Sequence, residues 1–252
     1  MSIRDLSFAY DEGRPVLEEV DLEIEAGERF GIIGPSGAGK STLLLHLNGI
    51  LSPAGGSAHI GEDPVDADHL ESVRSRVGLV FQDPDDQLFN PTVYEDVAFG
   101  PRNMGKSPEE VDAAVRQALE HLDLRGMEEA SSHHLSYGER KRVALATVLS
   151  MRPEVVAFDE PFSNLHPAMV ERLIGIIRDL PATIVVVSQS ILPVLATCDR
   201  LALLDRGRVR AVGGVREIAS DTRLLAECGL DYTFYCRLCR EAGVPLNEGG
   251  GD

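Results

Sequence analysis

Apolar and polar positions follow two different periods along the chain. Over residues 20–25 they alternate, and this period of two predicts a strand with one buried face. Short apolar runs at 30–33 and 77–81 have the pattern of strands that are buried on both faces. A leucine-rich stretch at 41–49 predicts a helix after the first of these runs.

Between about residues 83 and 150 the pattern becomes helical. Ser107 is suited to begin one helix as its N-cap, with Pro108 at the first helical position and Glu110 closing a capping box. The apolar positions from 111 to 122 then form a single stripe at helical spacing. A second capping box at 136–139 predicts another helix, which continues to about residue 149.

An α/β pattern returns after this helical block. The strands are expected at 155–159, 183–188 and 201–205, with a helix at 167–179. Strands that alternate with helices imply a parallel sheet with both faces covered. The helical block is therefore an insertion into an α/β core.

The charge balance excludes some classes of protein. The chain of 252 residues has 24 basic and 41 acidic residues, a net charge of −17. Gripping nucleic acid or anionic lipid needs clustered lysine and arginine, so neither is expected as a direct partner. No apolar run approaches the ~20 residues of a membrane span, and the first ten residues lack the apolar core of a secretory signal. We expect a cytoplasmic protein with free thiols, which reaches a membrane only through a partner.

Residues 34–41 match the phosphate-loop pattern G-x-x-x-x-G-K-[ST] in full, between a predicted strand and a predicted helix. Glycines allow backbone N–H groups to turn towards an anion, and the helix N-terminus adds a positive partial charge. Lys40 is expected to reach the β- and γ-phosphates, and the Ser41 hydroxyl to ligate Mg²⁺. The candidate nucleotide-binding residues here are Gly34, Pro35, Ser36, Gly37, Ala38, Gly39, Lys40, Ser41 and Thr42.

The predicted strand at 155–159 ends in two carboxylates. Asp159 is expected to hold the Mg²⁺ shell, and Glu160 to polarise the attacking water as a general base. A phosphate loop followed by such a pair predicts a nucleoside triphosphatase.

Residues 135–139, Leu-Ser-Tyr-Gly-Glu, narrow the choice because they resemble the ABC signature, usually LSGGQ. Ser136 lies 23 residues before Asp159, a spacing similar to that of ABC ATPases. The resemblance implies that Ser136 and Gly138 bind the γ-phosphate held by a second ABC ATPase subunit in a head-to-tail dimer. Tyr137 and Glu139 depart from the pattern, in place of a glycine and the glutamine.

Two further positions resemble landmarks of the same family. Gln82 is similar to the Q-loop glutamine, which implies contact with Mg²⁺ and the attacking water. Tyr10, 30 residues before Lys40, is similar to the aromatic residue that stacks on adenine. A simple core or edge aromatic is the alternative for Tyr10.

The segment 83–101 closely resembles the energy-coupling-factor (ECF) and cobalt-transporter subfamily, and the resemblance covers about residues 3–215. It implies that this segment receives the coupling helices of a transmembrane T component, which works with a substrate-binding membrane subunit. The implied function is ATP binding and hydrolysis that power import of a vitamin or transition-metal ion, at the cytoplasmic side of the membrane. A soluble ABC ATPase outside transport, or a regulatory ATP-binding module, is the alternative.

The implied architecture is a P-loop NTPase (RecA-like) α/β core with an N-terminal antiparallel β subdomain and an inserted α-helical ABC subdomain. The nucleotide-binding domain would span 1–213, with the helical subdomain at about 86–149 and a C-terminal extension at 214–252. ATP and Mg²⁺ are the implied cofactors.

Two positions depart from the family in ways that bear on catalysis. Gln189 stands where the switch histidine is usual, and His166 stands where the D-loop has aspartate. A glutamine side chain can hydrogen-bond but cannot carry a proton or a positive charge. We therefore predict slow hydrolysis with ATP binding intact; the alternative is a tolerated variant with full activity. A homodimer and a heterodimer both stay open.

The remaining candidates are weaker. Cys236 and Cys239 form a single C-x-x-C pair, which does not by itself indicate zinc, and the histidines at 133–134 read as a loop pair. The basic run 140–142 either attracts nucleotide phosphate or forms a solvated helix face. Residues 81–130 hold 12 acids and four basic residues, a surface that either receives basic coupling helices or only aids solubility.

Overall fold

The computed structural model describes residues 1–10 and 13–230 of the chain. Its larger sheet has parallel pairing throughout, except that the last two strands form an antiparallel pair at one edge. In spatial order the strands are β6 (Val77–Val80), β7 (Val155–Asp159), β8 (Thr183–Ser188), β3 (Arg29–Ile33), β9 (Arg200–Asp205) and β10 (Arg208–Gly214). The parallel sheet predicted from the sequence is confirmed, and the antiparallel edge strand β10 is an addition to it.

A smaller antiparallel sheet is built from the N-terminal part of the chain. Its strands are β2 (Leu17–Glu23), β1 (Ser2–Phe8), β4 (Gly55–Ile60) and β5 (Asp63–Pro64), in that spatial order. The predicted alternation is confirmed in β2, where Leu17, Val20 and Leu22 are buried and the residues between them lie nearer the surface. The structure thus has the antiparallel β unit that the resemblance implied.

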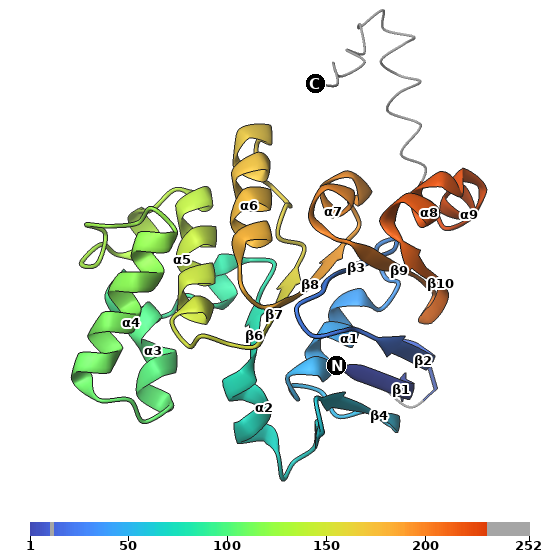
Figure 1. Cartoon of the computed structure of the whole chain (residues 1–252), viewed down its shortest axis with the longest axis horizontal. Coiled ribbons are helices and arrows are strands. Elements are labelled where there is room, and N and C mark those ends of the chain that lie inside the picture. Colours follow the sequence, from blue (N-terminus) through green and yellow to red (C-terminus); the bar gives the residue numbers. More distant parts are fainter. Residues whose placement is uncertain (11–12, 231–252) are drawn as a thin grey trace, which may run out of the picture.

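The helices fall into groups along the chain (Figure 1). Their bounds are α1 (Lys40–Leu47), α2 (Leu70–Arg76), α3 (Val93–Asn103), α4 (Pro108–His121), α5 (Tyr137–Leu149), α6 (Pro167–Asp179), α7 (Ile191–Thr197), α8 (Val215–Ser220) and α9 (Thr222–Glu227). Helices α3, α4 and α5 pack together at one end of the molecule, away from the smaller sheet. Both predicted capping boxes are present, at the starts of α4 and α5. Within the described ranges, no helix has the length and apolar character needed to cross a bilayer.

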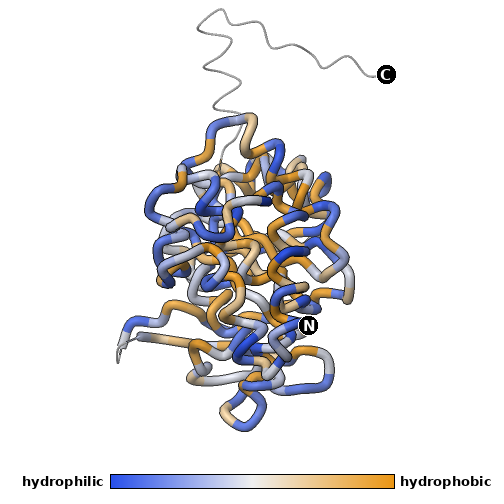
Figure 2. The backbone as a smooth tube through the Cα atoms, turned by 90° about the vertical axis from the view of Figure 1, so that its left-hand side faces the viewer, coloured by the Kyte–Doolittle hydropathy of each residue, from blue (hydrophilic) through white to orange (hydrophobic). Residues whose placement is uncertain are grey.

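The larger sheet separates two hydrophobic cores, because alternate residues of its strands point to opposite faces. In β8, for example, Ile184 and Val186 belong to the core beneath helices α3–α7, whereas Val185 and Val187 face α1 and the smaller sheet. Figure 2 shows hydrophobic stretches running through the middle of the molecule. Because a packed core covers each face of the sheet, the parallel strands are held firmly. Their carboxyl ends, where α/β folds bind ligands, are therefore fixed in position.

Candidate nucleotide-binding site

The loop between β3 and α1 has a backbone that only glycine accommodates at three points. Gly37 and Gly39 adopt positive φ values of 78° and 99°, in the left-handed region. A Cβ on Gly34 would lie 2.2 Å from the Leu204 carbonyl oxygen of β9. Ser36 is exposed at the tip and Ala38 is buried, so the loop stands with its tip open to solvent and its base fixed in the core.

Lys40 lies folded over this loop. Its Nζ donates hydrogen bonds to the carbonyl oxygens of Gly34 (2.9 Å) and Pro35 (3.1 Å) and lies 3.7 Å from Glu160 Oε1. Burial lowers the pKa of Lys40, and the charges of Glu160 and Asp159 oppose that shift. The loop therefore carries a cation that neutral carbonyls hold in place and that a bound anion could attract.

Ser41 and Asp159 meet across 118 positions of sequence. The Ser41 hydroxyl donates a hydrogen bond of 3.0 Å to Asp159 Oδ1, at the carboxyl end of β7. Burial raises the pKa of Asp159, and the bond from Ser41 opposes this. A hydroxyl and a carboxylate supply the oxygen ligands that Mg²⁺ prefers. Ser41 and Asp159 are therefore chemically suited to the Mg²⁺ ion that the sequence predicted there.

Glu160 is 7% exposed and both of its carboxylate oxygens accept hydrogen bonds. The Ser188 hydroxyl donates to Oε2 at 2.9 Å, and the backbone N–H of Gln189 donates to Oε1 at 2.8 Å. Glu160 also has a positive φ of 43°, which is uncommon for a residue other than glycine. Ser188 is a contact that the sequence analysis missed; its place at the carboxyl end of β8, beside β7, is the signal that could have found it.

Gln189 is placed beside Glu160 through its backbone, while its side chain is exposed. The structure therefore brings the predicted switch position next to the predicted general base. It leaves the amide group of Gln189 open to solvent.

Tyr10 stands beside the first turn of α1. Its hydroxyl and the Thr42 hydroxyl are 3.2 Å apart, and its ring packs edge-to-face on Phe8 with centroids 5.0 Å apart. Tyr10 as a whole is 58% exposed. Tyr10 is thus an exposed aromatic ring next to the phosphate loop, and its stacking on adenine stays a prediction.

Ser136 caps the N-terminus of α5 together with Glu139 of the same motif. Its hydroxyl donates to Glu139 Oε2 at 2.6 Å, and its backbone N–H donates to the same oxygen at 2.8 Å. These bonds lower the pKa of Glu139. No hydrogen bond or ion pair in the described ranges joins Ser136 or Gly138 to the phosphate loop. A pocket of about 320 Å³ lies between residues 136–139 and the loop 164–166, so His166 lies beside the signature of its own chain.

Gln82 is exposed, and in the described part of the chain its side chain makes no hydrogen bond to Ser41 or Asp159. Its carbonyl oxygen accepts a weak hydrogen bond of 3.5 Å from the Tyr137 hydroxyl. Gln87 adds a firmer connection to α5, because its amide donates to the Ala144 carbonyl at 3.0 Å. The segment after Gln82 is therefore attached to the helix that carries the signature.

The basic run 140–142 is not the solvated helix face that the sequence allowed. Lys141 is only 9% exposed and donates to the carbonyl oxygens of Glu160 and Pro161. Arg142 donates to two backbone carbonyls at the end of α4, and Arg140 pairs with Asp85 at 3.2 Å. Each side chain has partners within its own chain, and attraction of nucleotide phosphate by this run stays a prediction.

The acidic surface at 81–130 is smaller than its composition suggests. Asp85, Asp112, Glu120 and Asp123 each form an ion pair with an arginine of the same chain. Asp96 is buried, and its Oδ1 accepts three N–H hydrogen bonds from residues 89–90. Less of the acidic charge is therefore left for a basic partner than the sequence indicated.

The described ranges hold no group of three or more histidine, cysteine, aspartate or glutamate side chains that could bind a metal ion. Cys198 and Cys228 are free and buried, and burial raises the pKa of the Cys198 thiol to about 12. The pair Cys236 and Cys239 lies outside the described residues.

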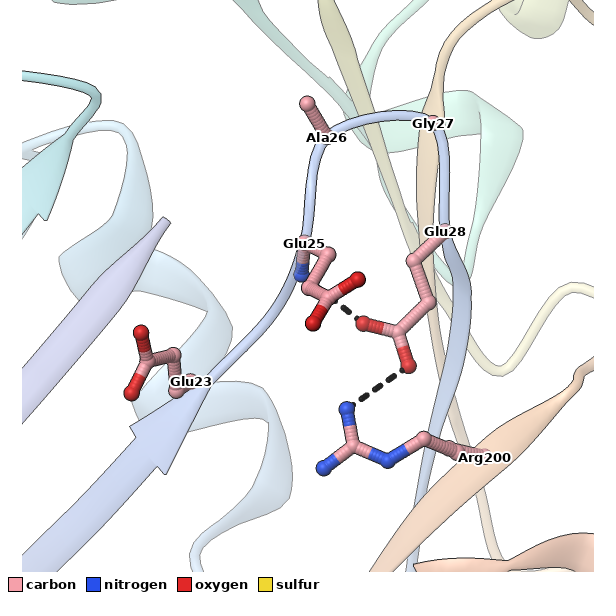
Figure 3. Close-up of a pocket in the computed structure, with 6 residues that line it drawn as sticks. All are labelled: Glu23, Glu25, Ala26, Gly27, Glu28 and Arg200. Carbon is pink, nitrogen blue, oxygen red and sulfur yellow. Dashed lines mark hydrogen bonds and ion pairs between the residues drawn. The ribbon is translucent and has the colours of Figure 1, made fainter.

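A pocket of about 540 Å³ lies away from the phosphate loop (Figure 3). It is lined by Glu23, Glu25, Ala26, Gly27, Glu28 and Arg200. The carboxylate of Glu28 pairs with Arg200 at 2.9 Å and accepts the backbone N–H of Glu25 at 2.8 Å. These residues precede β3 and begin β9, so the pocket is at the opposite end of those strands from the phosphate loop and is not the nucleotide site.

Comparison with known proteins agrees with the geometry. The ABC transporter family matches residues 17–163. The energy-coupling factor transporter ATP-binding protein EcfA of Methanothermobacter thermautotrophicus is 44% identical, over 91% of this chain and 76% of its own. The structure of cbiO1 from Clostridium perfringens, part of the ABC transporter complex cbiONQ, has a TM-score of 0.81 at 32% identity and covers 95% of this chain and 98% of its own. A dimeric ATP-binding cassette in a post-hydrolysis state with ADP and Pi has a TM-score of 0.76 at 27% identity, over 85% and 98% of the two chains. A chain with a phosphate loop, a carboxylate pair and a signature helix in this arrangement, and with these relatives, belongs to the ABC transporter family and is a nucleotide-binding ATPase.

Proposed function

We propose that this ATPase is the ATP-hydrolysing subunit of an importer of the ECF or cobalt type, bound to the cytoplasmic side of a membrane through its partners. The contact between Ser41 and Asp159, next to the buried Glu160, carries the catalytic part of this proposal. Two relatives named for ECF transport, at 44% and 41% identity, support the transport part. The cargo would be a vitamin or a transition-metal ion that a separate membrane subunit selects.

The residues of the site would have three separate roles: binding of the phosphates, binding of Mg²⁺ and activation of water. Backbone N–H groups of the phosphate loop and Lys40 would bind the phosphates, and Ser41, Asp159 and the Q-loop glutamine Gln82 would hold Mg²⁺. Bound Mg²⁺ supplies charge neutralisation at the phosphate oxygens. Glu160 would accept a proton from the attacking water, and Ser188 keeps its carboxylate in place.

A second ABC ATPase subunit, identical or different, would complete the site. Ser136 and Gly138 lie at the N-terminus of α5, and the partner's nucleotide would meet them there. In this chain the Ser136 hydroxyl and backbone N–H both donate to Glu139, so the partner's phosphate would take the place of that carboxylate as their acceptor.

An aromatic pair on the segment 83–101 is suited to receive the transmembrane T component. Phe89 is 67% and Phe99 48% exposed, and their rings pack edge-to-face with centroids 5.1 Å apart. Large exposed apolar side chains in contact with each other commonly mark a protein interface. We therefore assign this pair to the contact with the membrane partner.

Replacing both phenylalanines by serine is expected to reduce recovery of the transmembrane partner at least about tenfold when the tagged chain is purified from native membranes. The reason is loss of two buried aromatic anchors at the interface. Partner identification by mass spectrometry measures the effect, with ATP affinity expected to stay within about twofold because the pair is remote from the phosphate loop.

Val212→Ser is the matched control, because Val212 is also an exposed apolar residue (41%) but lies on β10. Equal recovery from the double variant and the control would refute the assignment of the aromatic pair. A wild-type chain that purifies without any membrane partner would instead favour the soluble ABC ATPase or the regulatory module.

Gln189→His is expected to raise kcat for ATP hydrolysis about tenfold. A protonated imidazole can make a charge-assisted hydrogen bond worth roughly twice a neutral one, a difference of about 1.4 kcal/mol. Steady-state hydrolysis between pH 6 and 8 tests this: the ratio of the variant's rate to the parent's should fall as the imidazole loses its proton. Equal rates would mean that glutamine serves this position with full activity.

A further inference from the structure

The ammonium group of Lys141 sits in a cage of oxygens on the loop that follows β7. Its Nζ donates to the carbonyl oxygens of Pro161 at 3.0 Å and Glu160 at 3.2 Å, and it lies 3.4 Å from Ser163 Oγ. The Ser163 hydroxyl itself donates to the Glu160 carbonyl at 2.8 Å. The lysine is therefore part of a hydrogen-bonded network that includes the backbone carbonyl of Glu160.

Burying this ammonium is costly. Lys141 is 9% exposed, and desolvation lowers the pKa of Lys141 to about 8, against the attraction of Glu160, Asp83 and Asp159. The Tyr137 ring, 5.5 Å from Nζ, covers another side of the ammonium group. A buried charge of this kind needs a full set of partners, which the loop supplies.

Two separate sets of contacts hold Glu160, one at its carboxylate and one at its backbone carbonyl. Its carboxylate is held by Ser188 and Gln189 at the end of β8, and its carbonyl oxygen is turned to Lys141 and Ser163. Its backbone keeps the positive φ of 43°, a conformation that is unfavourable for a residue other than glycine and persists only where the surroundings enforce it. The contacts of Lys141 and Ser163 with the Glu160 carbonyl help to keep this conformation.

We propose that Lys141 is a positioning residue for Glu160: it fixes the backbone of the catalytic carboxylate and ties it to the signature helix α5. The inference rests on the proposed catalytic role of Glu160. Because Lys141 lies on α5 five residues after Ser136, a displacement of α5 moves the ammonium group, and with it the carbonyls of Glu160 and Pro161. A change in the position of the signature would therefore change the position of the general base in the same subunit.

The competing explanation is that Lys141 only stabilises the fold. Arg142 provides the matched comparison, because it is the next residue on α5 and also donates to backbone carbonyls, those of Leu122 and Asp123. Its partners lie after α4 and not on the catalytic loop. A loss of general stability would therefore appear when either Lys141 or Arg142 is replaced. A loss of Glu160 positioning would appear only when Lys141 is replaced.

The test uses the full chain with Lys141→Met, Arg142→Met and, as a milder change that keeps the lysine, Ser163→Ala. Lys141→Met is expected to lower kcat at least about tenfold with KM for ATP within about twofold, because a misplaced base slows chemistry without loosening the nucleotide. In the nucleotide-free protein, the Ser163 amide, which donates to the Glu160 carbonyl, should exchange its hydrogen at least about tenfold faster. Ser163→Ala should shift kcat in the same direction by about threefold, and Arg142→Met should leave kcat within about twofold.

Equal kcat values and equal exchange at residue 163 in the parent and Lys141→Met would overturn the inference, as would equal losses in Lys141→Met and Arg142→Met. If Lys141→Met does not fold, an unchanged kcat in Ser163→Ala overturns it. A Glu160→Gln variant that hydrolyses ATP at the parent's rate would remove the proposed catalytic role instead, so the two failures can be told apart.

Discussion

Glu160→Gln is expected to lower kcat for ATP hydrolysis at least about 100-fold while the affinity for ATP stays within about threefold. An amide has nearly the same shape as the carboxylate, but it cannot accept a proton from water. In the structure the carboxylate accepts hydrogen bonds from the Ser188 hydroxyl and the Gln189 N–H, and a glutamine oxygen can keep the second of these. The fold around the site should therefore survive the substitution.

Steady-state hydrolysis and equilibrium titration with ATP measure the two quantities separately. Ser188→Ala is the matched control, since it removes one bond to Glu160 but leaves the proton acceptor; its kcat should fall far less, by about tenfold or below. A Glu160→Gln variant with more than a tenth of the parental kcat would contradict the role of general base.

Lys40→Met is expected to weaken ATP binding at least about 100-fold, equivalent to about 2.7 kcal/mol. A charge-assisted hydrogen bond to phosphate contributes about 1.5–3 kcal/mol, and Lys40 is the cation enclosed by the loop. The two carbonyl bonds that hold its Nζ now, to Gly34 and Pro35, are neutral contacts that a phosphate can replace. Calorimetric titration with ATP and Mg²⁺ gives the affinity.

Removing Lys40 also takes a cation from the buried carboxylate of Glu160, 3.7 Å away, so thermal unfolding of the variant must be measured alongside. Ser41→Ala separates the two proposed contacts. It keeps the lysine and removes the hydroxyl that bonds Asp159, so ATP affinity measured with EDTA should stay within about twofold while the dependence on Mg²⁺ weakens. If Lys40→Met binds ATP as tightly as the parent, the lysine does not hold the phosphates.

The parts of the site that rest on local sequence could be predicted. The phosphate loop needs glycines at fixed offsets, and Asp159 follows an apolar run that could only be a buried strand. The capping box at Ser136 was likewise predictable, because its two partners lie three residues apart. Each of these features is determined by neighbours within one turn or one strand.

Contacts between distant segments could not be predicted in this way. Lys141 reads as one more basic residue on a helix, and only the packing of α5 against the loop after β7 shows that its ammonium is buried. Similarly, the charge count could not show that Asp85 pairs with Arg140. The small, glycine-rich sequence of β4 has little strand propensity and gains its structure from pairing with β1.

The order of strands in the larger sheet has a consequence for how the chain is made. Strand β3 leads directly into the phosphate loop, yet both of its neighbours, β8 and β9, follow more than 140 residues later in the chain. A nascent polypeptide leaves the ribosome from its N-terminus, so the phosphate loop emerges long before the strands that support it. Its nucleotide-binding form can assemble only after β8 and β9 have been made, and until then β3 is an unpaired apolar strand that has to be kept from wrong partners.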